Sequence, residues 1–177
     1  GVFNPSTKRV PCLRARVICG VKGWAAVAGA SMAVACDMLP AAESARFIQS
    51  FIKIGLVPDA GRSWVLPRRI GMARAMGLAL TATALSAAEA VACGLIWKSH
   101  ADAALLSAAQ ELTATLASGP TTAFAATKML MQHAASTDFD THLALEASTQ
   151  KSCAESDHYS EGVEAFLQKR AAKFTGS

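Results

Sequence analysis

Two short stretches of this 177-residue sequence carry groups that could do chemistry. In the first, Ala28-Gly29-Ala30, small side chains let another molecule approach the backbone where we expect a helix to begin. The first amides of a helix lack intrahelical partners and favour an anion or a developing oxyanion. The simpler alternative is that these residues only allow a buried helix to pack closely on a sheet. The sequence taken alone favours that alternative.

The second stretch is the apolar loop that contains Pro58-Asp59. A carboxylate at this position either caps the helix that follows or transfers protons. Aspartate is a preferred N-cap residue, so the local pattern favours the cap. A role of Asp59 in acid–base catalysis requires burial, because burial makes a carboxylate hold its proton more tightly.

Two other candidate sites are disfavoured. The run Gly29-Ala30-Ser31-Met32-Ala33 resembles a serine-hydrolase elbow, but an elbow needs a strand that runs directly into its first glycine. Residues 22–28 intervene here, so Ser31 is disfavoured as a nucleophile. The four histidines and five cysteines show no spacing typical of metal ligands, and we expect no metal site.

The elements that must position these residues begin with residues 17–21, a β-branched run that we expect to form a covered strand. An apolar helix follows it and ends near Asp37. Further expected elements are extended segments at 38–41, 45–48 and 95–97, a loop at 51–61 and a helix at 62–68. Ser86-Ala87-Ala88-Glu89 is a capping box that starts a short helix, which Gly94 ends. The remaining predicted helices span residues 72–80, 102–118, 120–133, 138–153 and 157–169.

Composition narrows the class of protein. Hydrophobic residues make up 52% of the chain and charged residues 17%, with a mean hydropathy of +0.29, so we expect other subunits or a further segment to cover some of the surface. No apolar run reaches the ~20 residues of a membrane-spanning helix. The net charge of +4 comes from scattered basic residues without interleaved aromatics, which disfavours a nucleic-acid partner. Widely spaced cysteines and an N-terminus without an apolar signal segment predict a cytoplasmic protein.

Several ordered motifs together resemble one known family. They are residues 17–37 around Gly23-Trp24-Ala25-Ala26-Val27-Ala28-Gly29-Ala30, then Ala45-Arg46-Phe47, Gly55-Leu56-Val57-Pro58-Asp59-Ala60-Gly61, residues 85–90 with Gly94-Leu95, and residues 161–170. With these motifs the sequence resembles the crotonase family, the enoyl-CoA hydratases and isomerases. The resemblance implies an α/β fold with a partial β/α spiral core at residues 17–118. It also implies a C-terminal helical trimerisation region at 119–177, and a homotrimer or dimer of trimers. Residues 1–16 mix Pro, Ser, Lys and Arg without periodicity, which predicts a tail or linker.

The resemblance also implies how a thioester would bind. Its carbonyl would lie between two backbone amides, one of which is carried by Ala28-Gly29 in this sequence. The other amide, with much of the adenine-nucleotide pocket, would come from an upstream part of the family fold that this sequence does not contain. The two glutamates of the family's hydratases correspond to Ser31 and Phe51, which disfavours addition of water.

Isomerases of the family instead use an acid in the loop where Asp59 lies. The run Val57-Pro58-Asp59-Ala60-Gly61 looks most like the branch that isomerises ring epoxides in phenylacetate degradation. Lys169 resembles a lysine that reaches the phosphates of coenzyme A, and Phe166 is assigned to the same binding site. The alternative for Lys169 is a favourable charge at the end of a helix.

These expectations combine into one hypothesis. The protein would be an acyl-CoA isomerase of phenylacetate or fatty-acid catabolism that moves a double bond or ring epoxide next to a thioester, with Asp59 as the acid and base. Coenzyme A is part of the substrate, and no separate cofactor is expected. The alternatives are an enoyl-CoA hydratase, a non-catalytic truncated homologue that binds coenzyme A and oligomerises, and a serine hydrolase acting through Ser31.

Overall fold

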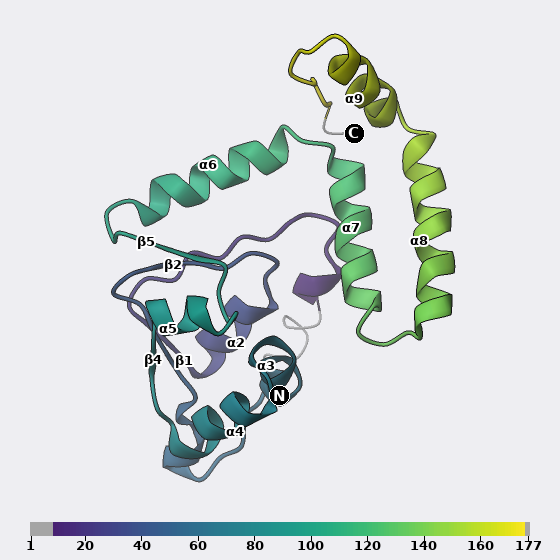
Figure 1. Cartoon of the computed structure of the whole chain (residues 1–177). Helices are drawn as coiled ribbons and strands as arrows, with labels where there is room; N and C mark the ends of the chain where they lie inside the picture. Colours follow the sequence, from purple (N-terminus) through teal and green to yellow (C-terminus); the bar gives the residue numbers. More distant parts are fainter. Residues whose placement is uncertain (1–8, 176–177) are drawn as a thin grey trace. The chain divides into compact units, whose positions relative to one another are not determined.

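The computed structural model describes residues 9–175, apart from the side chains of residues 27 and 28, and divides the chain into two compact units (Figure 1). The first unit is Gly1–Glu111 and the second is Leu112–Ser177. The division falls inside helix α6, Leu105–Ala117. The expected boundary at 118/119 therefore stays a prediction. Of the expected tail, residues 9–12 are helical, and residues 1–8 lie outside the described part.

Two small sheets of very short strands form the first unit. Strand β1 (Trp24–Ala26) pairs in parallel with β3 (Arg46–Ile48), which pairs antiparallel with β4 (Leu85–Ser86). The second sheet pairs β2 (Pro40–Ala42) in parallel with β5 (Lys98–His100). The extended segments expected at 38–41 and 45–48 are thus confirmed. The third, expected at 95–97, is wrong by three residues, because pairing with β2 begins only at Lys98.

The segment expected to be a covered strand at residues 17–21 is extended and paired, but it is neither continuous nor covered. It makes two isolated parallel bridges, Ile18 with Met38 and Val21 with Ala41. The amides of Cys19 and Val21 also donate to backbone carbonyls of residues 38 and 40, each at 3.0 Å. Of the five residues only Val21 is buried. The segment therefore extends the β2 sheet as a hydrogen-bonded edge.

Beside the helical residues 9–12 and the start of α6, the described part of the first unit contains the helices α2 (Val27–Ala35), η1 (Ser50–Ile54, a 3₁₀ helix), α3 (Arg62–Ile70), α4 (Met72–Thr81) and α5 (Ala87–Ala92). The starts predicted at residues 62 and 72 are confirmed. The expected loop at 51–61 instead begins with η1, which buries Phe51. The core packs α2, through Ala30, Ala33 and Val34, with residues of β3 and α3 that include Phe47, Leu66 and Ile70.

In the second unit three helices follow one another, α7 (Thr121–His133), α8 (Phe139–Ala154) and α9 (Asp157–Leu167). Asp138 is the N-cap of α8, where its side chain accepts from the Thr141 amide at 2.9 Å. These helices agree with the predicted ranges to within a few residues. Neither α7 nor α8 contains a buried residue, so their apolar side chains remain accessible in the single chain.

The contribution of the capping box at the start of α5 to stability can be tested by mutation. The Ser86 hydroxyl accepts from the Glu89 amide, while Glu89 Oε2 accepts from the Ser86 amide at 2.7 Å. Ser86→Ala should lower the free energy of unfolding by about 1 kcal/mol, because an amide of the first turn loses its acceptor. Urea denaturation followed by circular dichroism measures the change. Ser107→Ala, in the first turn of α6, is the control, and an equal loss in both variants would contradict the assignment.

Candidate active site

The start of α2 presents its first amides without a side-chain cap. Strand β1 runs directly into the helix, and the N-cap Ala26 has an extended backbone and no side chain that could accept. Ala28 and Gly29 are the second and third residues of the helix, where amides have no intrahelical acceptor. A Cβ added to Gly29 would meet no atom within 4 Å. Another molecule therefore has room to approach these amides.

The opposite end of α2 is held firmly. The Arg69 guanidinium donates from Nη2 to the carbonyls of Val34 at 2.9 Å and Cys36 at 3.3 Å. These are the carbonyls that a helix leaves unpaired at its C-terminus, where a positive charge is favoured. This contact bonds α3 to the last turn of α2, and so fixes the position of the helix that carries Ala28 and Gly29.

Ser31 does not have the setting of a nucleophile. The residues before Gly29 are not an intervening loop, as the sequence indicated, but strand β1 and the first residues of α2. Ser31 is the fifth residue of that helix and is 1% exposed, whereas an elbow serine lies at the turn with its hydroxyl accessible. Phe51 is also buried, at 3% exposed. Both positions thus hold neutral, buried side chains.

Asp59 does not cap α3. The N-cap is Gly61, whose left-handed backbone (φ 79°) follows a second left-handed residue, Ala60 (φ 48°). This double turn leaves Asp59 two residues before the N-cap. Asp59 bonds to the start of α3 only through its backbone carbonyl, which accepts from the Arg62 amide at 2.9 Å. The cap that the sequence favoured is therefore wrong.

The Asp59 side chain is exposed, as are the neighbouring Leu56 and Val57. The burial that acid–base catalysis requires is thus not supplied by the described residues of the single chain. The loop nevertheless gathers one carboxylate and two large apolar side chains on an accessible surface. The assignment of Asp59 as acid and base stays a prediction.

The sequence analysis did not predict that the Arg62 side chain is buried. This side chain is only 2% exposed, and its Nε and Nη1 atoms have no hydrogen-bond partner among the described residues. Burial, reinforced by the nearby positive charge of Arg69, lowers the pKa of Arg62 to about 10. The one available signal was its spacing, because Arg62 shares the buried face of α3 with Leu66 and Ile70.

The predicted coenzyme A residues belong to the second unit. A largely apolar groove of about 490 Å³ is lined by α7, α8, α9 and the residues after them, among them Ala123, Leu130, Cys153, Val163, Phe166 and Phe174. Phe166 borders this groove and is 82% exposed, and Val163 and Leu167 on the same helix are exposed too. Apolar side chains of α9 therefore line a groove that is open to solvent in the single chain. Lys169 follows α9 with a left-handed backbone (φ 54°) and is exposed.

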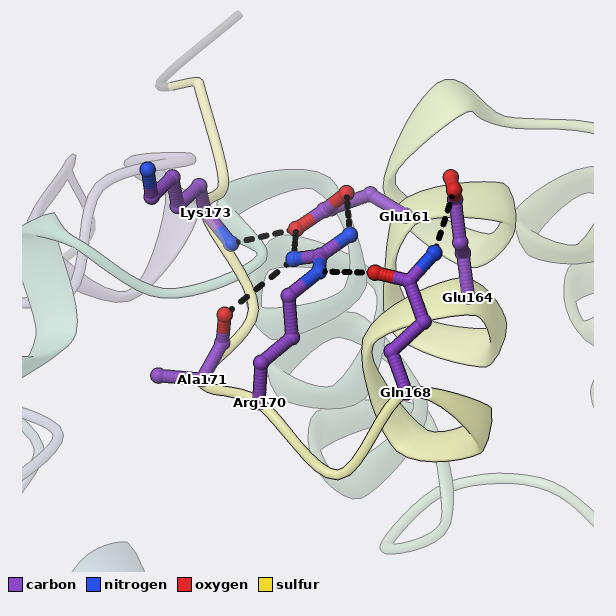
Figure 2. Close-up of polar contacts among 6 residues, drawn as sticks. All are labelled: Glu161, Glu164, Gln168, Arg170, Ala171 and Lys173. Carbon is purple, nitrogen blue, oxygen red and sulfur yellow. Dashed lines mark hydrogen bonds and ion pairs between the residues drawn. The ribbon is translucent and has the colours of Figure 1, made fainter.

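A polar clasp fixes the chain on both sides of Lys169 (Figure 2). The Arg170 guanidinium donates to both oxygens of Glu161, at 2.6 and 3.0 Å, and the Lys173 amide donates to Glu161 Oε1 at 2.6 Å. These hydrogen bonds, that from the Arg170 side chain foremost, lower the pKa of Glu161 from 4.5 to about 2. The clasp folds the segment after α9 back along the helix, where Phe174 lies edge-on to His158.

Comparison with known proteins identifies the family. The family described as Enoyl-CoA hydratase/isomerase matches residues 3–177. The chain belongs to this family. A 1,2-epoxyphenylacetyl-CoA isomerase of Escherichia coli is 45% identical over 98% of this chain and 66% of its own length. A probable enoyl-CoA hydratase of Rhodobacter capsulatus is 48% identical over 98% of this chain and 68% of its own.

Solved structures confirm the crotonase fold. A putative enoyl-CoA hydratase/isomerase from Mycobacterium abscessus superposes with a TM-score of 0.96 at 31% identity, covering 99% of this chain and 67% of that one. A putative enoyl-CoA hydratase from Streptomyces coelicolor A3(2) gives 0.95 at 33% identity, with 99% and 64% covered. The chain thus spans about two thirds of the length of the crotonases that it matches.

In the part of the chain that the structure describes, every helix is too short or too polar to span a bilayer. The same residues contain no group of three or more histidine, cysteine, aspartate or glutamate side chains that could hold a metal ion.

Because the clasp depends on the ionised Glu161 carboxylate, we expect the segment around Lys169 to become less ordered as the pH falls. A carboxylate whose pKa is lowered by folding stabilises the fold above its unfolded pKa, here 4.5, and the contribution is lost as the pH falls toward about 2. Glu161→Gln should therefore speed hydrogen exchange of the Lys173 amide severalfold at pH 6. Glu164→Gln is the control, because Glu164 bonds only to the Gln168 side chain in this cluster. Equal exchange in the wild type and Glu161→Gln would contradict the role of the clasp.

Proposed function

We propose that this crotonase is an isomerase of acyl-CoA thioesters, which moves a double bond or a ring epoxide next to the thioester. The observation that carries the proposal is the uncapped start of α2, whose amides at Ala28 and Gly29 are open to a ligand, in the same unit as the accessible carboxylate of Asp59. The name of the Escherichia coli relative, an epoxyphenylacetyl-CoA isomerase, supports the same reaction class.

The amides would act on the electron-rich oxygen of the substrate. When a base removes a proton next to a thioester, negative charge collects on the carbonyl oxygen. A preorganised amide donor stabilises such an oxyanion by roughly 2.7–4 kcal/mol. Ala28 and Gly29 suit this role because they lie on a buried helix whose other end Arg69 holds, so that little reorganisation is needed.

Asp59 would move the proton. For an enoyl-CoA, it takes a proton from one carbon and returns it to another while the double bond moves, so this isomerisation needs no water, oxidant or reductant. General acid–base catalysis of this kind contributes about 10²–10⁴-fold. An ordinary carboxylate is a weak base for a carbon acid, and the amides must therefore lower the cost of forming the carbanion at the same time.

Asp59 is exposed in the single chain, so the proposed role as a base requires that further surface covers it in the working enzyme. We propose that the working form is a homotrimer or a dimer of trimers, in line with the accessible helices α7 and α8. Phe166 and Lys169 would hold the coenzyme A part of the substrate, and no separate cofactor enters the scheme. The free cysteines of the described residues suit a reducing cytoplasm, and phenylacetate or fatty-acid catabolism is the proposed setting.

A hydratase is the second candidate, since the Rhodobacter capsulatus relative carries that name. Hydration of a double bond needs groups that activate water, and in this chain the hydratase positions are the buried, neutral Ser31 and Phe51. A coenzyme A-binding protein without activity is the third. Calorimetric titration with an acyl-CoA beside an isomerase assay separates the isomerase from this third candidate, because binding without any turnover favours the third.

Asp59→Asn tests the proposed base. The variant should lose isomerase activity by about 10²–10⁴-fold, because an amide cannot accept the proton, and should keep its affinity for an acyl-CoA within severalfold. Glu43→Gln, a second exposed acid of the same unit, is the matched control and should keep full activity. Unchanged turnover in Asp59→Asn would remove Asp59 from the mechanism.

Lys169→Ala tests the coenzyme A site. If Lys169 meets a phosphate, the variant should bind acyl-CoA about tenfold more weakly at low salt, and the difference should shrink as salt rises, since screening weakens exposed charge pairs. Lys151→Ala, at the end of α8, removes an equally exposed lysine and should not change the affinity. Equal affinity in Lys169→Ala and the wild type would refute the assignment.

A further inference from the structure

Lys169 has a backbone conformation that lysine rarely adopts. Its φ of 54° lies in the left-handed region, directly after Gln168, the C-cap of α9. The Lys169 amide donates to the carbonyl of Phe166 at 3.2 Å. The next amide, that of Arg170, donates to the carbonyl of Ala165 at 3.0 Å. This pair of bonds is a common left-handed helix end, at which glycine is preferred. A residue with a Cβ atom therefore costs free energy here that glycine would not.

Side chains on both sides of Lys169 hold this strained turn in place (Figure 2). The Arg170 guanidinium donates two hydrogen bonds to the Glu161 carboxylate, and its Nε atom donates to Gln168 Oε1 at 2.7 Å. The residue before Lys169 is thus bonded to the residue after it, and the latter is bonded to α9. Backbone strain persists only where the surrounding contacts over-determine it. The clasp supplies such contacts.

The charges around the turn leave the Lys169 ammonium available to a ligand. Glu161, the acid of the clasp, is already engaged by the Arg170 guanidinium and the Lys173 amide. Within the residues that the structure describes, the Lys169 ammonium makes no ion pair, and its side chain is exposed. An anion that arrives from solvent can therefore reach this cation without displacing a partner.

A favourable charge at the end of α9 does not account for this arrangement. A lysine within the last turn, where the backbone is right-handed, would interact with the helix end equally well and without strain. Strain of this kind is a reason to look for a function, because it often occurs where a ligand binds. The feature to be explained is a cation on a backbone that is fixed before any ligand arrives.

We propose that Glu161 and Arg170 are positioning residues for the coenzyme A part of the substrate. By holding Lys169 in its left-handed conformation, they fix in advance the lysine that meets a phosphate of the thioester. A group that is ordered before binding loses less conformational freedom when the ligand binds, so it contributes more to affinity. This inference rests on the proposed acyl-CoA chemistry and adds to it the residues that order the phosphate contact.

Calorimetric titration of the 177-residue chain with butanoyl-CoA tests the proposal, because this saturated thioester has no double bond to move. Glu161→Gln should weaken binding severalfold at low salt, since Lys169 is released to other conformations. Removal of a negative charge would by itself strengthen the binding of an anion, so weaker binding has to come from lost order. Glu164→Gln is the control. It removes the same charge from the same helix, where Glu164 bonds to the Gln168 side chain, and should not weaken binding.

Two further variants separate positioning from a merely structural role. Arg170→Lys keeps the net charge but loses the bidentate pair with Glu161, and should weaken binding as Glu161→Gln does. Lys169→Gly keeps the turn and removes the ammonium. In a chain that carries Lys169→Gly, neither of the other two substitutions should change the affinity further, because no ammonium remains to be positioned.

Thermal unfolding tests the strain by itself. Lys169→Gly should unfold at a higher temperature than Lys169→Ala, because both lack the ammonium and only alanine places a Cβ atom in the left-handed turn. An equal or lower unfolding temperature of the glycine variant would contradict the strain on which the proposal rests.

The binding results also distinguish this inference from the proposed function. If Lys169→Gly weakens binding but Glu161→Gln and Arg170→Lys do not, the lysine contacts the ligand and only the positioning role is overturned. A loss in Glu161→Gln that persists beside Lys169→Gly would overturn the positioning role as well. If Lys169→Gly binds as tightly as the wild type, or if the wild type does not bind butanoyl-CoA, the proposed coenzyme A site fails and this inference with it.

Discussion

The architecture of the first unit depends on how the two ends of α2 differ in their hydrogen bonding. Its C-terminal carbonyls are bound by the Arg69 guanidinium, which satisfies the end that attracts positive charge. Its N-terminal amides receive no side-chain cap, and no atom lies within 4 Å of where a side chain at Gly29 would begin. Since the body of the helix is buried, the amides are held in place by packing. A fixed set of unpaired donors is what the proposed stabilisation of an oxyanion requires.

Local signals in the sequence predicted the helices well. The capping box at Ser86 and the glycine at 94 mark the two ends of α5 through hydrogen bonds or backbone conformations a few residues away, so they can be recognised without knowing the fold. Strands are different. The strands of the described chain are two or three residues long, and which residues pair depends on a distant partner. That is why residues 17–21 were overestimated and β5 was expected three residues too early.

The candidate site shows the same limit. The open amides could be anticipated from three small residues, because amides at a helix start depend on local geometry. The position of Asp59 could not be anticipated, because two consecutive left-handed residues place the N-cap at Gly61 and leave the carboxylate outside the helix. The burial of Arg62 was equally hidden, because it depends on the packing of α3 against the rest of its unit rather than on its neighbours in the sequence.

The exposed helices of the second unit affect how the stability of the protein depends on its concentration. Helices of 13 and 16 residues without one fully buried side chain gain little from a hydrophobic core of their own. In the proposed oligomer their folded state would gain from contact with a further copy, and by mass action such a gain grows with protein concentration. Dilution of that oligomer would therefore destabilise these helices and leave them more open to proteases.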